Sequence, residues 1–177
     1  MKKFELTTES ITFLGRTLFR IKALISFGDV EAGELGGYIE KEGNLSHEGN
    51  AWVYDNARVY DNAWVCGDAR VYGDARVCGD AEVCGDARVC GNAWVCGNAE
   101  VYGDADIATI SGFGSEYRTT TFFRTKNNEI AVKCGCFYGT LAEFREKVKE
   151  THGDNRYAKE YLMIADLMEM HFRGEEK

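Results

Sequence analysis

The sequence of 177 residues contains no proline, only three histidines and no uninterrupted run of 18 apolar residues. Without such a run, no segment predicts a transmembrane helix. The start, Met1–Glu5, becomes polar at once and lacks the apolar stretch of a secretory signal peptide. A net charge of −8 argues against binding long nucleic acid or an anionic membrane through the overall electric field. We therefore expect a soluble, cytoplasmic protein.

A six-residue repeat occupies the middle of the chain. Residues from Gly49 to Ala108 form ten consecutive copies of (Gly/Asp)-(Asp/Asn)-Ala-x-(Val/Ile)-(Tyr/Cys/Ala), without any insertion. Ala-x-Val is a short stretch of alternating inward and outward positions, which predicts a strand. Glycine followed by Asp or Asn predicts a corner, because these residues tolerate positive φ and form local hydrogen bonds. One copy cannot bury its apolar side alone, so the copies must stack.

A strand-plus-corner unit of six residues resembles the hexapeptide-repeat family. The resemblance implies a mainly β fold, a left-handed parallel β-helix in which three repeats make one coil and residue i lies under residue i+18. The register extends backwards through Gly43–Glu48 and Gly37–Glu42, which gives about four coils. We therefore predict an N-terminal hairpin cap and lead-in at residues 1–36, the β-helix at residues 37–110, and a C-terminal ββαα segment at residues 111–177.

The segment before the repeats predicts a β-hairpin. Apolar stretches at Ile11–Leu14 and Thr17–Leu24 flank Gly15-Arg16. We expect this hairpin to cover the open first coil, because an exposed coil end would invite edge-to-edge assembly.

The segment after the repeats predicts strands at residues 119–124 and 129–134. A capping box at Thr140 and Glu143 predicts the start of a helix, which ends at Gly153.

A second predicted helix starts near Asn155. Its apolar residues spread beyond one stripe, so either the end of the β-helix or other subunits must cover it, and the sequence leaves both possibilities open. The apolar positions are Tyr157, Tyr161, Leu162, Met163, Ile164, Leu167, Met168, Met170 and Phe172.

Two stretches outside the repeats resemble a group of small phage and prophage proteins built around the same repeat. They are the lead-in Gly28–Glu40, followed by Asn44-Leu45-Ser46, and the tail Gly135–Phe144 with Thr151–Asn155. The resemblance implies a phage or mobile-element origin in a bacterial host, and it carries no activity.

Catalysis is not the function that the sequence favours. Hexapeptide-repeat acyltransferases resemble this chain, but they need a histidine base, and related carbonic anhydrases need three histidine ligands on the coils. Residues 49–108 contain no histidine; the three present are His47, His152 and His171. An acyltransferase, the second alternative, would depend on His47 or His152. Cys134-Gly135-Cys136 is half of a metal site or simply part of an apolar strand, and we expect no metal and no cofactor.

Stacking with three repeats per coil predicts three outward columns. Two combine Arg with Trp and Tyr, which suits either subunit interfaces or a ligand cleft in which aromatic rings stack on a base and Arg pairs with phosphate. The columns are Trp52, Arg70, Arg88 and Asp106; then Arg58, Arg76 and Trp94; then Trp64, Glu82 and Glu100.

The sequence favours a non-catalytic, homotrimeric binding protein that sequesters a small anionic nucleotide-type signal, as phage counter-defence, in grooves between subunits. The alternative is a structural or protein-interaction scaffold without a small ligand. The candidate ligand-binding residues are Arg58, Arg70, Arg76, Arg88, Trp52, Trp94, Tyr54, Tyr60 and Tyr72.

Five of the seven cysteines occupy the sixth position of the repeat. Stacking places Cys66 one coil from Cys84 and Cys78 one coil from Cys96, close to disulfide range. We expect all of them to be reduced thiols, as in a reducing cytosol.

Overall fold

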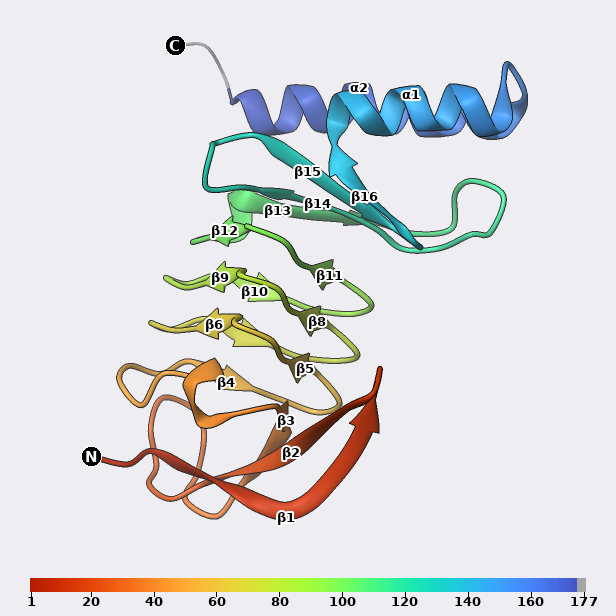
Figure 1. Ribbon diagram of the computed structural model, residues 1–177. Helices are drawn as coiled ribbons and strands as arrows, with labels where there is room; N and C mark the ends of the chain where they lie inside the picture. Colours follow the sequence, from red (N-terminus) through yellow and green to blue (C-terminus); the bar gives the residue numbers. More distant parts are fainter. Residues whose placement is uncertain (175–177) are drawn as a thin grey trace.

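The computed structural model describes residues 1–174 as a stack of coils that is closed at both ends (Figure 1). The coils are built from two-residue strands, one per repeat, and no strand needs to be longer because each repeat turns a corner after Val. These strands are β4 (Trp52–Val53), β5 (Arg58–Val59), β6 (Trp64–Val65), β7 (Arg70–Val71), β8 (Arg76–Val77), β9 (Glu82–Val83), β10 (Arg88–Val89), β11 (Trp94–Val95) and β12 (Glu100–Val101).

The short strands stack into three parallel ladders. We call β4–β7–β10 the first face, β5–β8–β11 the second face and β6–β9–β12 the third face. Arg70 pairs with Arg88, Arg76 with Trp94, and Glu82 with Glu100, each pair being three repeats apart. The chain is thus mainly β, with a solenoid of about four turns, and the predicted stacking of three repeats per turn is confirmed for these coils.

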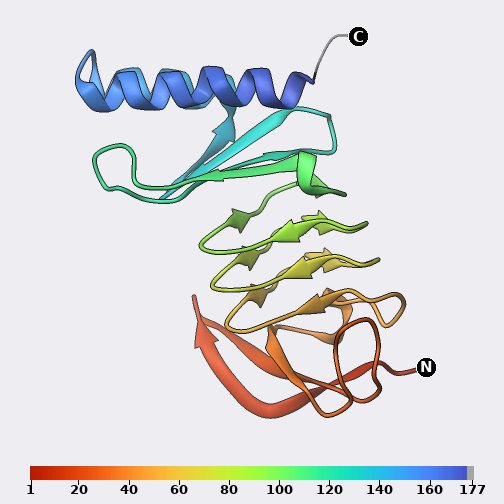
Figure 2. The same ribbon diagram turned by 180° about the vertical axis from the view of Figure 1, so that it is seen from behind.

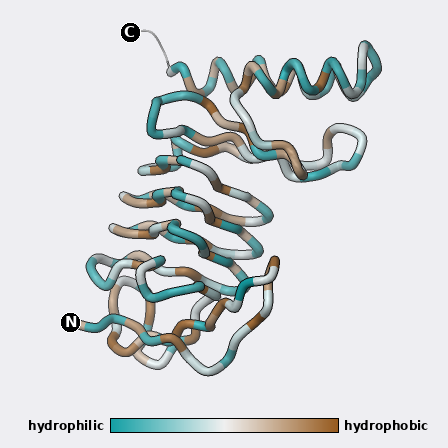
Figure 3. The backbone as a smooth tube through the Cα atoms, viewed as in Figure 1, coloured by the Kyte–Doolittle hydropathy of each residue, from teal (hydrophilic) through white to brown (hydrophobic). Residues whose placement is uncertain are grey.

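The interior of the solenoid consists of the alanine and valine of every repeat. From Ala51 to Val101 these side chains are essentially inaccessible to solvent. Apolar and polar residues therefore alternate at short intervals around each coil (Figure 3).

The corners require the residue at the first position of the repeat to adopt positive φ. Gly85 has φ +62°, and a Cβ there would lie 2.1 Å from the carbonyl oxygen of Tyr102 in the next coil. Asp55 and Asp61 take the same conformation, at φ +52° and +61°, in the two repeats that begin with Asp. Asp can replace Gly at these two corners because its short polar side chain tolerates this region, and each carboxylate accepts a hydrogen bond from the backbone N–H of a glycine in the next coil.

The predicted register of the first coil is wrong by two residues. Tyr38 and Ile39 in β3 (Leu35–Ile39) pair with Arg58 and Val59, a separation of 20 instead of 18. Leu45 likewise lies under Val65. Ile39 and Leu45 are larger than alanine, so they take the valine position of the repeat rather than the alanine position.

A 3-10 helix, η1 (Glu42–Asn44), forms the corner between Ile39 and Leu45. The two extra residues come after it, because Leu45 and Val53 are eight residues apart instead of six. The Asn44 side chain is fully buried and donates hydrogen bonds to the carbonyl oxygens of Asp61, at 3.1 Å, and Ala63, at 2.8 Å. It satisfies the backbone of the coil above, as a regular corner would.

A β-hairpin covers the lower end of the solenoid, as predicted. It consists of β1 (Phe4–Phe13) and β2 (Arg16–Ala23), and β2 pairs with β3 of the first coil. The hairpin therefore extends the sheet of the second face. Its tip, where β1 meets β2, rises beside that face (Figure 1).

The tenth repeat does not continue the solenoid, contrary to the prediction. Its residues form η2 (Asp104–Asp106) and then β13 (Ile107–Ile110), which pairs antiparallel with β14 (Thr120–Arg124). Asp106 therefore does not extend the Trp52, Arg70 and Arg88 column as a strand. The sheet continues through β15 (Ile130–Cys134) and β16 (Phe137–Thr140), so two strands are added to the predicted pair.

The C-terminal sheet closes the upper end of the solenoid. Phe123 belongs to the solenoid core, and the Thr121 hydroxyl accepts a hydrogen bond from the Trp94 backbone N–H at 3.0 Å. On its other side, Phe122 and Val132 pack against the two helices. The sheet is thus a lid with one side toward the solenoid and one toward the helices.

The helices are α1 (Leu141–His152) and α2 (Arg156–Arg173), and they lie at the opposite end of the stack from the hairpin (Figures 1 and 2). The predicted capping box of Thr140 and Glu143 is present, and α2 starts near Asn155 as predicted, with the Asn155 side chain as its N-cap. α2 packs against α1 and the C-terminal sheet of the same chain, and the Phe172 carbonyl oxygen accepts a hydrogen bond from Arg124 of β14 at 2.7 Å. Coverage by other subunits stays a prediction. Three apolar side chains remain exposed on its outer side, namely Met163, Leu167 and Met170. Within the described residues, no helix is long and apolar enough to cross a membrane.

Candidate functional site

The fourth position of each repeat points outward, so every face presents a vertical column of these side chains. The pairing confirms the predicted columns from β4 to β12. The segments before and after the solenoid cover parts of these columns and leave other parts exposed to solvent.

On the second face, the hairpin covers the predicted ligand-binding residues. The guanidinium groups of Arg58 and Arg76 lie 4.5 and 5.1 Å from the centre of the Phe13 ring. Tyr60 is buried and packs edge-on against the same ring. These three predicted residues therefore hold the hairpin against the solenoid.

Trp94, at the top of the second face, is enclosed between two cations. Arg76 lies 5.0 Å from its ring centre, and Lys133 of the C-terminal sheet lies 4.1 Å away. A cavity of about 420 Å³ adjoins this stack and is also lined by Tyr117 and Arg118 of the loop before β14.

On the first face, Trp52 points outward from the coil as predicted, but it is not open to a ligand. Its side chain is fully buried, because Phe27 and Phe4 pack edge-on against the indole at 5.4 and 6.2 Å. Both phenylalanines come from the N-terminal segment, which wraps over the lower end of this face.

Above Trp52, the first face stays open and brings four predicted residues together. Two adjoining cavities of about 400 and 280 Å³ share Tyr72 and Arg88 in their linings. We call this continuous depression the ladder groove. Its lining residues are Asp29, Tyr54, Asp55, Arg70, Tyr72, Arg88, Cys90, Ala93, Asp104, Ile107, Ala108 and Thr109.

The arginines of the ladder groove differ in how firmly carboxylates hold them. Arg70 forms an ion pair with Asp29 at 3.0 Å and keeps 44% of its side chain exposed. Arg88 lies 3.8 Å from Asp104 and is 60% exposed. The Asp104 carboxylate also accepts a hydrogen bond from the Arg88 backbone N–H, at 3.1 Å. Arg88 is therefore the more available cation.

The tyrosines of the ladder groove are neutral hydrogen-bond donors at physiological pH. Burial, together with the neighbouring Asp29 carboxylate, raises the pKa of Tyr54 to about 12. Its hydroxyl donates to Asp29 at 3.1 Å. A hydrogen bond with the Cys90 thiol raises the pKa of Tyr72.

Sequence reasoning missed the acidic residues of the ladder groove. Asp29 comes from the lead-in, and Asp104 from the repeat that leaves the solenoid. Asp55 was assigned only to a corner. No repeat pattern places Asp29 beside Arg70, because the lead-in returns to this face through an irregular turn between Phe27 and Val30.

The groove presents guanidinium, phenol, thiol and carboxylate groups to a ligand. None of the three histidines lines it in the part of the chain that the structure describes. His47 stacks on Phe4 and lies 2.7 Å from Glu42, and His152 stacks on Tyr161 between the two helices.

A larger cavity of about 550 Å³ lies between the β14–β15 turn and the ends of both helices, and sequence reasoning did not anticipate it. It is lined by Arg124, Arg145 and Arg173, yet each of these arginines pairs with a carboxylate. We therefore regard it as a structural ion-pair network.

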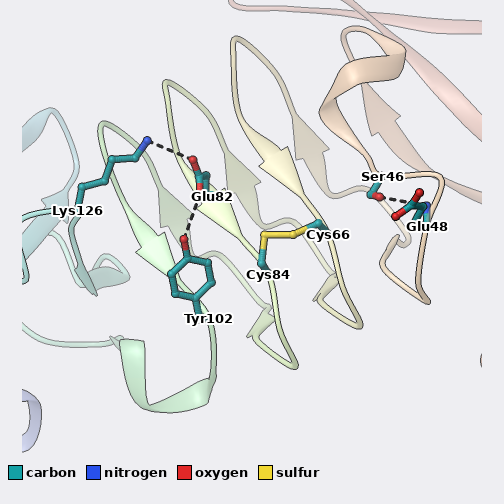
Figure 4. Close-up of a disulfide and its surroundings, with 7 residues drawn as sticks. All are labelled: Ser46, Glu48, Cys66, Glu82, Cys84, Tyr102 and Lys126. Carbon is teal, nitrogen blue, oxygen red and sulfur yellow. Dashed lines mark hydrogen bonds and ion pairs between the residues drawn. A yellow bond between two sulfur atoms is a disulfide. The ribbon is translucent and has the colours of Figure 1, made fainter.

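The cysteines differ from the prediction of seven free thiols. Cys66 and Cys84 of the third face form a disulfide, with their Cα atoms 4.5 Å apart (Figure 4). Stacking by one coil creates this separation, which lies within the usual range for a disulfide. Cys134 ends β15 and accepts a hydrogen bond from the Thr120 hydroxyl, whereas Cys136 is exposed. Among the described residues, no group of three or more His, Cys, Asp or Glu side chains could hold a metal ion.

Comparison with known proteins supports the repeat architecture. A family model described as the YdcK beta solenoid repeat matches residues 51–67, 65–79 and 69–85. These overlapping matches lie within the coils and leave both caps unmatched. No curated protein matches the chain.

Proposed function

We propose that this chain is a non-catalytic binding protein of phage or mobile-element type that holds a small anionic, nucleotide-type ligand in the ladder groove. The observation that carries the proposal is the placement of Arg70 and Arg88 on successive coils beside Tyr54 and Tyr72, in one continuous groove. The proposal includes a left-handed hexapeptide-repeat solenoid, association into a homotrimer, and sequestration of a signal as counter-defence.

Two guanidinium groups one coil apart suit a phosphate or diphosphate. Arginine presents paired donors to phosphate oxygens, and the separation of neighbouring strands, about 4.8 Å, allows both to reach one group. Tyrosine rings and their neutral hydroxyls can then stack on and hydrogen-bond to a base or ribose. Binding requires the ligand to displace the Asp104 carboxylate from Arg88, which is a weak ion pair at 3.8 Å.

The location of the proposed site differs from the one that the sequence favoured. Arg58, Tyr60 and Trp52 take part in packing the N-terminal segment, so the proposed contacts are Arg70 and Arg88 with Tyr54 and Tyr72.

A thermal-shift screen of the full chain tests this proposal. The panel contains inorganic phosphate, mono-, di- and cyclic nucleotides, ADP-ribose derivatives and acyl-CoA compounds. A ligand at 100 times its Kd stabilises the folded state by about 2.7 kcal/mol, which is readily measured. A shift with a nucleotide supports the proposal. The absence of any shift contradicts it, and a shift confined to acyl-CoA favours an acyltransferase.

Two charge-reversal variants then locate the site. Arg88→Glu should abolish the shift, whereas Arg118→Glu makes the same charge change outside the ladder groove and should leave it intact. The opposite result would place the ligand in the cavity beside Trp94.

A second candidate function is that of a self-assembling scaffold, and the third face favours it. Trp64 is 43% exposed and Tyr102 is 47% exposed on this face. Aromatic side chains are enriched in protein interfaces, and contact with a second copy of the solenoid would bury these two. Light scattering after size exclusion should then show a trimer for the wild type and a monomer for Trp64→Glu. A monomeric wild type contradicts both this candidate and the trimer in the first.

A further inference from the structure

Cys78 and Cys96 occupy the same position in successive coils of the second face. Arg76 pairs with Trp94 and Val77 with Val95, and the Cys78 backbone N–H donates to the Val95 carbonyl oxygen at 3.0 Å. Cys66 and Cys84 stand in the same relation on the third face, and they form the disulfide of Figure 4. The solenoid thus brings a second cysteine pair into the register that already forms a disulfide.

Hydrogen-bond donors surround the Cys78 sulfur. Trp94 Nε1 donates to it at 3.3 Å. A hydrogen bond from the Cys96 thiol is the main cause that lowers the pKa of Cys78, and the same contact raises the pKa of Cys96. Both shifts favour the negative charge on Cys78.

The two sulfurs also differ in access. Cys78 is 7% exposed within a small apolar cluster that includes Leu18 and Tyr60, whereas Cys96 lies at the edge of that cluster and is partly exposed. A small oxidant can reach this edge, but a large protein thiol cannot approach Cys78 directly.

The remaining free cysteines lack this arrangement. Cys90, on the first face, has Tyr72 one coil below it, and Cys134 bonds to the Thr120 hydroxyl. Cys90 therefore serves as a matched control, because it has the same repeat position without a thiol in its column.

We propose that Cys78 and Cys96 are a peroxide-reactive dithiol that oxidises to a disulfide between β8 and β11. The Cys78 thiolate attacks one oxygen of hydrogen peroxide, the O–O bond breaks, and hydroxide leaves and takes up a proton as water. Cys78 is then a sulfenic acid. The Cys96 sulfur attacks the Cys78 sulfur, its proton leaves with the hydroxyl group as a second water, and the S–S bond forms. Two thiols and one peroxide thus give one disulfide and two waters.

Differential alkylation of the full chain tests this assignment. The protein is treated with hydrogen peroxide, its free thiols are blocked with light iodoacetamide, and its disulfides are then reduced and labelled with heavy iodoacetamide. Tryptic peptides Val77–Arg88 and Val89–Arg118 contain the two cysteines together with Cys84 and Cys90, so fragmentation spectra assign each label. The described chain has five free cysteines, and oxidation should leave three.

The expected result is heavy label on both Cys78 and Cys96, with light label on Cys90. The Cys90→Ser variant should behave in the same way. Light label on Cys78 and Cys96 after oxidation, or a bond from either one to a different cysteine, overturns the proposal.

The order of the two steps has its own test, which does not depend on forming the disulfide. In Cys96→Ser, the sulfenic acid on Cys78 persists and should be trapped by dimedone at that residue. A dimedone adduct absent from Cys78 but present on Cys90 would show that the environment of the second face does not activate Cys78.

Discussion

Arg70 and Arg88 on the first face occupy the same repeat position as Arg58 and Arg76 on the second face, yet their surroundings differ. The first pair faces solvent and carboxylates from the flanking segments. The second pair stacks on Phe13 at the tip of the hairpin. The position in the repeat therefore determines that a side chain points outward. The segments outside the repeat determine whether it contacts solvent, a carboxylate or an aromatic ring.

Trp52→Ala tests how much the burial of this outward position under the N-terminal segment contributes to stability. Truncating this fully buried indole should lower the free energy of unfolding by about 3–5 kcal/mol, because it leaves a cavity against Phe4 and Phe27. Arg70→Ala, one coil above in the same column, should change it by less than about 1 kcal/mol. Urea unfolding of both variants measures the difference. Equal decreases in the free energy of unfolding for the two variants would contradict the conclusion that Trp52 belongs to the core and Arg70 does not.

Phe13→Ala should weaken the contact that covers the second face. Loss of two cation–π contacts and of the Tyr60 edge contact should lower stability by about 1–3 kcal/mol. The same change should speed alkylation of Cys78, because the hairpin tip no longer shields the cluster around it. Leu14→Ala, at an exposed neighbour, is the control and should do neither. Unchanged alkylation of Cys78 would show that Phe13 does not hold the hairpin in place.

Lys3 offers a pH test of the covered end of the first face. Its ammonium donates to the Ala51 carbonyl oxygen at 2.9 Å, and burial lowers its pKa from 10.5 to about 8. Between these two values the unfolded chain holds more protons than the folded chain, so the free energy of unfolding rises with pH. Because the Lys3 side chain is buried, the rise should be on the order of 1–3 kcal/mol, each unit of pKa difference corresponding to about 1.4 kcal/mol.

Chemical unfolding between pH 8 and about 9.5 measures this rise before the tyrosines titrate. Lys3→Met should remove only the Lys3 contribution, so the difference in unfolding free energy between wild type and variant should change with pH while the cysteines titrate alike in both proteins. A difference between the two proteins that stays constant with pH would assign the rise to another group.

Asp104→Asn should have the smallest effect on stability and sharpen the open face. The amide oxygen still accepts the Arg88 backbone hydrogen bond, so stability should change by less than about 0.5 kcal/mol. Loss of the carboxylate frees the Arg88 side chain and should lower the Kd of any nucleotide that binds the ladder groove. Calorimetric titration of both proteins gives the comparison, and weaker binding by the variant would contradict the site.

The coils could be predicted in detail because their period is strict. An uninterrupted repeat places every fourth and sixth position, so the three columns and the two cysteine pairs follow from counting three repeats to a coil. The first coil could not be placed by counting, since two extra residues shift Ile39 and Leu45. Their size was a usable signal, because the alanine position is too small for either side chain.

The surroundings of the candidate site could not be predicted from the repeat. Burial of Trp52 depends on Phe4 and Phe27, and the acidic side of the groove depends on Asp29. Phe4 begins β1, and Phe27 and Asp29 lie in the irregular segment between β2 and β3. Because these residues lie outside the six-residue repeat, their sequence positions do not predict which face of the solenoid they contact. The folded structure is needed to show it.

Each cap is attached to particular faces of the solenoid, and this limits how many repeats can be inserted without rotating one cap relative to the other. The hairpin continues the sheet of β3 and β5, and the upper sheet is anchored above β11 and β12. Insertion of one repeat would turn the upper end by a third of a revolution relative to the hairpin. Insertion of three would raise it by one strand spacing, about 4.8 Å, without rotation. Repeats added in sets of three therefore lengthen the solenoid and keep each cap over the same faces.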